Sequence, residues 1–234
     1  MLLWNLGLLR QDPKAFFLLV IVVAFSLLIA ITVHEFSHAL MANRLGDPTA
    51  KRMGRLSLNP VKHLDPLGTL MLLLVGFGWG KPVPINPGYF RMNPRRGMAL
   101  SAFAGPLSNL AVAAVLGVII RSGAVAWHSP YSWPFWPFAS WSAGWVAADI
   151  ISYVILFNLI LAVFNLIPIA PLDGFNIAVG ILPQRQAEAM ARTGQYGPLL
   201  LLVVVFLGYF VGFLWDFLLR AVDLFARVFV GQPL

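Results

Sequence analysis

The chain has no cysteine and few charged side chains. Without cysteine it can form no disulfide, offer no thiolate ligand to a metal and carry no cysteine nucleophile. A metal would have to be bound by histidine and carboxylate groups, and the 234 residues include only four histidines and nine acidic residues. Charged residues make up 11% of the chain and hydrophobic residues 59%, far from the average of soluble domains. The composition indicates an integral membrane protein.

Long polar stretches are also absent, so nothing in the sequence indicates a soluble domain. We predict an all-α, polytopic membrane protein with a single domain over residues 1–234, a core at residues 16–180, and a C-terminal span and tail at residues 181–234. A helix needs ~20 apolar residues to cross the ~30 Å hydrocarbon layer. Four runs meet this length, at residues 16–41, 98–120, 145–167 and 196–219.

A shorter apolar segment at residues 64–80 is rich in glycine and has basic residues on both flanks. Basic loops favour the cytoplasmic side of a membrane, so a segment with basic loops at both ends is expected to enter the bilayer and return. We predict a re-entrant element here, with a short spanning helix as the alternative. After it, Pro82, Pro84 and Pro87 favour an extended, β-like segment.

The net charge of +7 and the pI near 10.3 arise mainly from lysines and arginines in short loops between apolar runs. This distribution is a membrane-topology signal, so we expect the lipid bilayer as partner and no nucleic acid. The basic stretch at residues 44–62 places the end of the first span in the cytoplasm and the N-terminus outside. The expected location is the cell (inner) membrane. The tail after residue 219 is expected to lie along the membrane interface as an amphipathic helix.

The first span carries His34, Glu35 and His38 in the pattern His-Glu-x-x-His. Histidines four residues apart project from one face of a helix, so both imidazoles can bind one zinc ion, and the glutamate acts as general base towards water. The alternative is that the histidines only form hydrogen bonds to neighbouring helices. Ionisable groups at membrane depth are costly and are functional candidates by default, which favours a zinc site inside the helix bundle.

A catalytic zinc site needs a third protein ligand and one open position. The acidic candidates near the later spans are Asp149, Asp173 and Asp216. Asp149 and Asp216 lie near the outer ends of their spans in the predicted topology, which is the wrong depth. Asp173 follows a span that runs back towards the cytoplasmic side, and the prolines at 168 and 171 allow the chain to turn its carboxylate inward. We predict Asp173 as the third ligand, with a helix-capping role as the alternative.

Four motifs resemble, in order and spacing, the site-2 protease family of intramembrane metalloproteases (peptidase family M50), in its short bacterial and archaeal form. They lie at residues 34–38, 59–68, 105–109 and 165–174. The resemblance implies one zinc ion per chain, bound by His34, His38 and Asp173, with Glu35 as catalytic base. It also implies that Asn165 binds the substrate backbone or the oxyanion. The implied function is a zinc metalloendopeptidase that acts within the membrane on transmembrane proteins or peptides.

A helical substrate offers no free backbone carbonyl, so it must unwind before cleavage. The extended segment, with Lys81, Val83 and Ile85, is expected to pair with the unwound substrate as an added strand. Asn109 is a further candidate for substrate contact, with helix packing as the alternative. Two other functions stay open, a non-catalytic zinc-binding membrane protein and a zinc transporter. The sequence leaves the substrate, the cleavage site, the regulatory signal and the oligomeric state undetermined.

Overall fold

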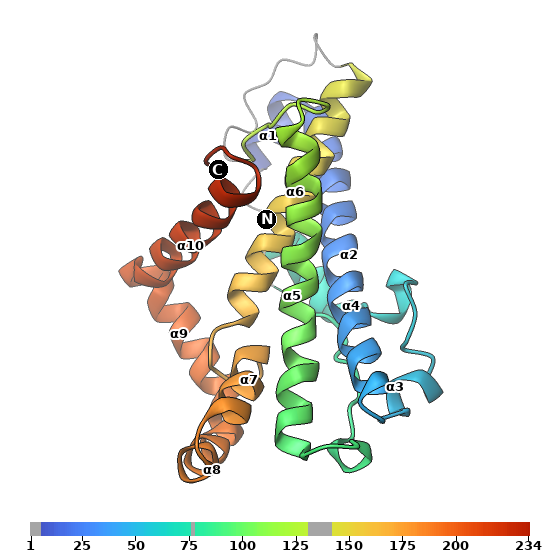
Figure 1. Cartoon of the computed structure of the whole chain (residues 1–234). Helices are drawn as coiled ribbons and strands as arrows, with labels where there is room; N and C mark the ends of the chain where they lie inside the picture. Colours follow the sequence, from blue (N-terminus) through green and yellow to red (C-terminus); the bar gives the residue numbers. More distant parts are fainter. Residues whose placement is uncertain (1–5, 76–77, 131–141) are drawn as a thin grey trace.

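The computed structural model of the chain describes residues 6–75, 78–130 and 142–234. These residues form mainly α-helices, and no β-strand occurs among them (Figure 1). Four helical stretches are long and apolar enough to cross a membrane: Pro13–Arg44, Pro94–Arg121, Ala143–Asn165 and Gln184–Gly208. This confirms the predicted all-α class with four candidate spans.

The first three of these stretches are helices α2, α5 and α6. The fourth begins with α8 (Gln184–Thr193), continues through a 3-10 turn at Gly194–Tyr196 and enters α9 (Gly197–Val211). The shorter elements of the described chain are α1 (Leu6–Gln11), α3 (Thr49–Arg52), α4 (Pro66–Val75), α7 (Asp173–Ile181) and α10 (Phe213–Phe229), with 3-10 turns at Pro60–Lys62 and Pro87–Tyr89.

Each of the three long helices begins at a side chain that caps its first turn. Asp12 accepts hydrogen bonds from two backbone N–H groups of α2, and Asn93 does the same for α5. Ser142 accepts one from the N–H of Trp145 in α6. Such caps satisfy backbone donors that have no partner within the helix. The three helices begin at residues 13, 94 and 143, within a few residues of the predicted starts at 16, 98 and 145.

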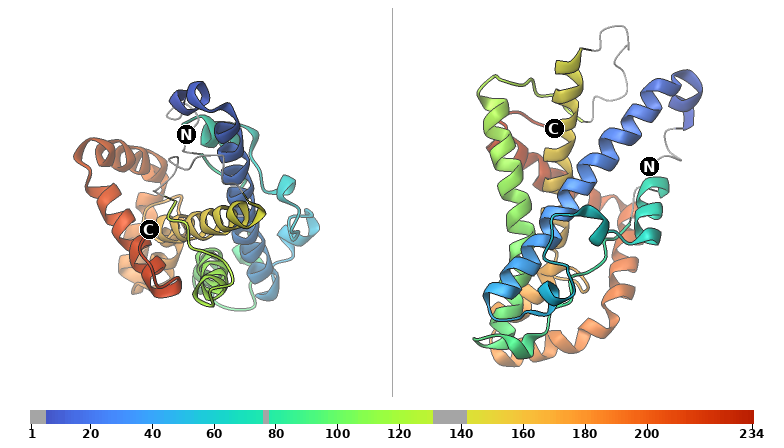
Figure 2. Two further views of the ribbon diagram at one scale, coloured as in Figure 1. Left: turned by 90° about the horizontal axis from the view of Figure 1, so that it is seen from above. Right: turned by 90° about the vertical axis from the view of Figure 1, so that its right-hand side faces the viewer.

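Helix α6 lies at the centre of the arrangement, with α2 and α5 packed against it on one side and α10 on another (Figure 2). One apolar core joins the four helices and includes Val23, Ala113, Ile155, Leu159 and Val222. Helix α5 buries mainly small residues, which lets helix backbones approach closely. This close approach brings polar groups of α2 within reach of α5 and α6.

The segment at residues 64–80 contains one short helix, α4. Its ten residues extend ~15 Å at 1.5 Å per residue, about half of the hydrocarbon thickness. An isolated antiparallel bridge joins Leu64 to Gly80, so the two ends of the segment lie side by side. This return supports the re-entrant interpretation; residues 76–77 lie outside the described chain. Residues 81–86 are extended, but the predicted β-like segment forms no strand within the described ranges.

The last predicted span, at residues 196–219, is wrong in its limits. Helix α9 ends at Val211, because Gly212 adopts a left-handed conformation with φ of 76°. Helix α10 starts directly after it and buries one face, formed by Leu218, Val222 and Ala226, in the bundle. The predicted interfacial tail is therefore part of a helix that packs on α6.

Candidate metal centre

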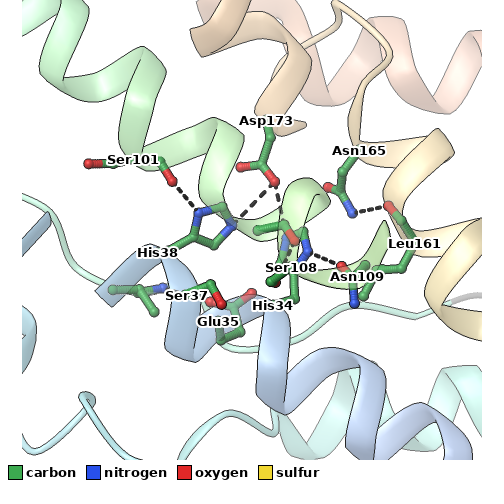
Figure 3. A network of polar contacts seen from close by, with 12 residues as sticks. His34, Glu35, Ser37, His38, Ser101, Ser108, Asn109, Leu161, Asn165 and Asp173 are labelled. Carbon is green, nitrogen blue, oxygen red and sulfur yellow. Dashed lines mark hydrogen bonds and ion pairs between the residues drawn. The ribbon is translucent and has the colours of Figure 1, made fainter. Parts of the chain in front are cut away.

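The two histidines of the His-Glu-x-x-His motif and Asp173 meet at one point. His34 and His38 lie one turn apart on α2, and Asp173 is the first residue of α7. Oδ2 of Asp173 lies 3.0 Å from Nε2 of His34 and 3.2 Å from Nε2 of His38 (Figure 3). Both histidines are buried, and one candidate ligand atom of each of the three residues lies within 4.8 Å of the others. The structure thus brings the predicted ligand set together.

A turn between α6 and α7 carries Asp173 to the site. Helix α6 ends at Asn165, and residues 166–172, which include two prolines, lead into α7. The chain passes itself so closely here that a Cβ on Gly174 would lie 2.5 Å from the backbone oxygen of Ile167. Glycine after the aspartate is therefore required for the turn that directs the carboxylate inward.

Helix α5 approaches the two histidines at Gly105. A Cβ at this position would lie 2.5 Å from Cε1 of His38 and 2.7 Å from Cε1 of His34. Carbon atoms in real structures do not approach this closely, so any side chain here would displace the imidazole rings. Gly105 leaves the space that both rings occupy.

The hydrogen bonds of the two imidazoles determine which ring nitrogen carries the proton. Nδ1 of His38 lies 2.7 Å from the backbone oxygen of Ser101, and Nδ1 of His34 lies 2.6 Å from Oδ1 of Asn109. Both oxygens only accept hydrogen bonds, so each Nδ1 carries the hydrogen and each neutral ring has its lone pair on Nε2. Oδ2 of Asp173, which both Nε2 atoms face, receives no hydrogen bond. Two lone pairs and a carboxylate oxygen converge on one position.

This donor set fits a zinc ion. Ligand atoms ~2.0–2.1 Å from a tetrahedral zinc lie ~3.3 Å from one another, close to the observed Nε2–Oδ2 separations. Histidine ligands of zinc commonly donate their other N–H to a carbonyl or carboxylate oxygen, as both rings do here. No lysine or arginine occurs among the described residues that line the adjoining cavity, although two carboxylates, Glu35 and Asp173, do. A divalent cation would balance both charges.

A cavity of about 430 Å³ opens beside the three ligand candidates and is lined mainly by apolar side chains. Glu35 and Asn165 both reach its wall. Oε2 of Glu35 accepts a hydrogen bond of 3.2 Å from the N–H of Val83. Nδ2 of Asn165 donates one of 2.9 Å to the backbone oxygen of Leu161 (Figure 3). The predicted base and the predicted oxyanion contact therefore border the same space as the ligands.

The proline segment, residues 81–87, forms part of the cavity wall. Val83 and Ile85 line the cavity, whereas Lys81 is exposed and does not. The backbone of Lys81 is held at both its groups, because its N–H donates to the oxygen of His63 and its oxygen accepts from the side chain of Arg55. Of the three substrate contacts predicted in this segment, the structure brings two, Val83 and Ile85, to the cavity.

Asn109 lies behind His34 and is fully buried. Its Oδ1 faces His34, and its Nδ2 donates to the backbone oxygen of Ala30 at 3.0 Å and to Oδ1 of Asn158 at 2.7 Å. The structure therefore places Asn109 against a ligand candidate and not on the cavity wall. Asn158 was missed by sequence reasoning. The available signal was its polar side chain inside an aliphatic span.

The other acidic and histidine candidates lie elsewhere. Asp149 pairs with His128 at 2.6 Å near the start of α6, whereas the site lies near the end of that helix. Asp216 belongs to α10. His63 is buried and its Nε2 lies 2.6 Å from the backbone oxygen of Ser57.

Comparison with known proteins identifies the family. The model of the family described as "Peptidase family M50" matches residues 122–209, which include Asn165 and Asp173. "Putative zinc metalloprotease YwhC" of Bacillus subtilis is 39% identical over 213 residues, or 89% of this chain and 92% of that protein. "Putative zinc metalloprotease Rip2" of Mycobacterium tuberculosis is 31% identical over 234 residues, or 95% of this chain and 82% of that protein. No solved structure matches the chain. With a similarity that covers nearly the whole length of a relative, and with four apolar helices, this chain belongs to peptidase family M50 and is a metalloprotease of the membrane.

Proposed function

We propose that the protein is a zinc metalloendopeptidase that hydrolyses peptide bonds of transmembrane substrates within or at the edge of the bilayer. The observation that carries this proposal is the convergence of His34, His38 and Asp173 beside Glu35, in a cavity between helices apolar enough to span a membrane. The other members of the cavity wall are mostly apolar, as expected for a site that excludes bulk water.

In this proposal one zinc ion is held by His34, His38 and Asp173. When bound, zinc acts as a Lewis acid that polarises a carbonyl group and makes water acidic enough to be deprotonated near neutral pH. Glu35 is the general base. Its carboxylate accepts the proton of the attacking water and later returns it to the leaving amine. The N–H of Val83 would hold this carboxylate in place through its hydrogen bond to Oε2.

Asn165 is proposed to bind the scissile carbonyl group. One hydrogen of its amide goes to the backbone oxygen of Leu161, and the second remains for an oxygen in the cavity. A donor fixed in this way stabilises the negative charge that develops on the carbonyl oxygen during attack. Removal of such a donor in other enzymes costs roughly 10²–10³ in rate.

The substrate would bind in an extended conformation next to the proline segment. Carbonyl groups inside a helix are already engaged in hydrogen bonds, so the substrate helix must unwind locally to reach the site. Val83 and Ile85 lie on the cavity wall, where an extended peptide can pair with their backbone. Lys81 would take part through the position of its anchored backbone, since the residue is exposed and does not line the cavity.

We further propose that the protein resides in the cell (inner) membrane with the active site nearer the cytoplasmic side. His34 and His38 lie in the last third of α2, and the basic loop at residues 44–62 follows directly. The positive-inside rule places that loop in the cytoplasm.

The decisive experiment measures the zinc content of the purified protein and its cleavage of a model transmembrane substrate, for wild type and Glu35→Gln. Glu35 is no ligand in this proposal, so both proteins should contain about one zinc per chain. Loss of a general base costs roughly 10²–10⁴ in rate, so cleavage should be found only in wild type.

Other results would select another function. Cleavage retained by Glu35→Gln would contradict the assigned base. Zinc in both proteins without cleavage of any substrate would favour a non-catalytic zinc-binding membrane protein, and zinc flux into proteoliposomes without peptide would favour a transporter.

A further inference from the structure

A chain of buried side-chain amides runs from α6 to the ligand candidate His34. Nδ2 of Asn158 donates to the backbone oxygen of Val154 at 2.8 Å, and Oδ1 of Asn158 accepts from Nδ2 of Asn109 at 2.7 Å. Oδ1 of Asn109 in turn lies 2.6 Å from Nδ1 of His34. Asn109 and Asn158 are both 0% exposed. The chain thus links α6, α5 and α2 through three hydrogen bonds away from water.

The orientations of both side-chain amides, those of Asn158 and Asn109, follow from the backbone oxygen of Val154. The backbone oxygen of Val154 only accepts, so the nitrogen of the Asn158 amide must face it and the oxygen must face Asn109. Oδ1 of Asn158 and the backbone oxygen of Ala30 are both acceptors, so the amide nitrogen of Asn109 must face them and donate to both. The oxygen of Asn109 is left for His34, which must then donate from Nδ1. The lone pair of the ring consequently lies on Nε2, on the side of Asp173.

His38 has the same tautomer, with its hydrogen on Nδ1, but no side-chain amides are needed to fix it. Its Nδ1 faces the backbone oxygen of Ser101, which is an acceptor in any orientation. The amide of Asn109 is different, because a rotation by 180° would present its NH₂ group to His34 and favour the ring with its hydrogen on Nε2. A hydrogen at that position would occupy the site of a metal ligand bond.

We propose that Asn158 is a positioning residue that acts through Asn109 to hold His34 in the metal-binding tautomer and orientation; this inference rests on the proposed metal site. Asn158 itself does not line the cavity, and its side chain hydrogen-bonds to Asn109 and Val154 and to none of the three ligand candidates. Its oxygen and the backbone oxygen of Ala30 together exclude the alternative orientation of Asn109, because an inverted amide would place its own oxygen against both of these acceptors. Buried polar chains of this kind have large effects when one member is removed, since its partners cannot turn to water.

The test measures the zinc dissociation constant of the purified protein by competition with a chelator. Asn158→Leu has nearly the size of asparagine but no acceptor, and we expect it to weaken zinc binding by about 10–100-fold, as is usual when partners of metal-binding histidines are lost. Asn158→Ser keeps a hydroxyl for Val154 but has a shorter side chain that cannot reach Asn109. It is the variant with less risk to folding and should weaken zinc binding in the same direction.

The matched control is Ser26→Ala, which removes a fully buried side-chain hydrogen bond of 2.7 Å within α2, two turns before His34. Its zinc dissociation constant should equal that of wild type. Circular dichroism of all variants checks that the helices form.

A double-mutant cycle separates positioning from a general structural role. If Asn158 acts through Asn109, then Asn158→Leu should cause no further loss of zinc affinity in an Asn109→Leu background. The absorption spectrum of the cobalt-substituted protein should also change in both single variants, because a ligand nitrogen is displaced.

The possible failures can be told apart. Wild-type zinc affinity in both Asn158 variants, or losses that add fully in the double variant, would overturn the positioning role and leave the metalloprotease proposal intact. A wild-type protein without zinc affinity would overturn both.

Discussion

At the scale of single residues, the metal centre depends on an absent side chain as much as on the ligands. Gly105 has no Cβ at a point where one would lie 2.5 Å from Cε1 of His38. Glycine is poor at stabilising a helix, by about 1 kcal/mol relative to alanine, so a glycine in the middle of α5 needs a packing reason. The two imidazole rings provide that reason. The space for the two imidazole rings is therefore obtained at the expense of some stability of α5 at Gly105.

We expect Gly105→Ala to weaken zinc binding because the added methyl group must push the histidine rings from their positions. Overpacking of this kind costs roughly 1–3 kcal/mol, which corresponds to about 5–150-fold in the dissociation constant if it acts on the bound geometry. The measurement is chelator competition with the purified variant.

Gly117→Ala is the control on the same helix. A Cβ there would lie 2.6 Å from the backbone oxygen of Phe229, so it crowds α10 and not the histidines. This variant should lower the melting temperature but keep the zinc affinity of wild type. Equal affinity in Gly105→Ala and wild type would contradict the assigned role of Gly105.

At the scale of elements, the proline segment combines a rigid backbone with a single unused donor. Lys81 and Val83 donate their N–H groups to His63 and Glu35, and Asn86 donates to Oδ2 of Asp47 at 2.7 Å. The prolines have no N–H. Within the described ranges only the N–H of Ile85 has no acceptor in this segment, and Ile85 lines the cavity. An extended substrate can use this donor without breaking an existing hydrogen bond.

Ile85→Pro should therefore impair cleavage and spare zinc binding. It removes the free N–H while favouring an extended backbone, and one lost hydrogen bond of about 0.5–1.5 kcal/mol predicts a loss of roughly 2–10-fold in kcat/KM. Ile85→Ala keeps the N–H and serves as the matched variant, which shows how much of the loss belongs to the side chain. Unchanged cleavage by Ile85→Pro would contradict the pairing.

The elements that sequence reasoning predicted well are those with strong local signals. Long aliphatic runs predicted α2, α5 and α6, and the spacing of His34 and His38 on one helix predicted their common face. Asp173 followed from depth and from the prolines before it. The limits of α9 and α10 did not follow, because a left-handed Gly212 and the packing of α10 on α6 are not visible in local hydrophobicity.

The hydrogen bonds of Asn109 and Asn158 behind the site could also not be predicted from local sequence patterns. Asn109 and Asn158 lie 49 positions apart and meet only through the packing of α5 on α6. Their roles depend on which oxygen faces which nitrogen, a property of the assembled bundle. Sequence patterns identified Asn109 as a polar residue in a span, but not the side of the helix that it faces.

At the scale of the whole molecule, most basic residues belong to loops and helix ends at one end of the bundle. Helix α3, the start of α5 and α8 lie together at this end, and α1, the end of α5 and the start of α6 lie at the opposite end (Figure 1). The elements at the first end, or the residues next to them, include Arg44, Lys51, Arg52, Arg55, Arg91, Arg95, Arg96, Arg185 and Arg192. This asymmetry agrees with the positive-inside rule if that end faces the cytoplasm.

The orientation can be tested cleanly because the chain has no cysteine of its own. Met53→Cys, at a position 64% exposed after α3, and Ser122→Cys, at an exposed position after α5, place single thiols at opposite ends. With a maleimide that cannot cross membranes, intact cells should label Ser122→Cys, and Met53→Cys should react only after the membrane is opened. Labelling of both from the same side would contradict the proposed topology, in which α5 crosses the membrane and the segment at residues 64–80 returns to the side from which it entered. Labelling of Met53→Cys alone in intact cells would invert the proposed orientation and place the ligand-bearing end of α2 towards the outside.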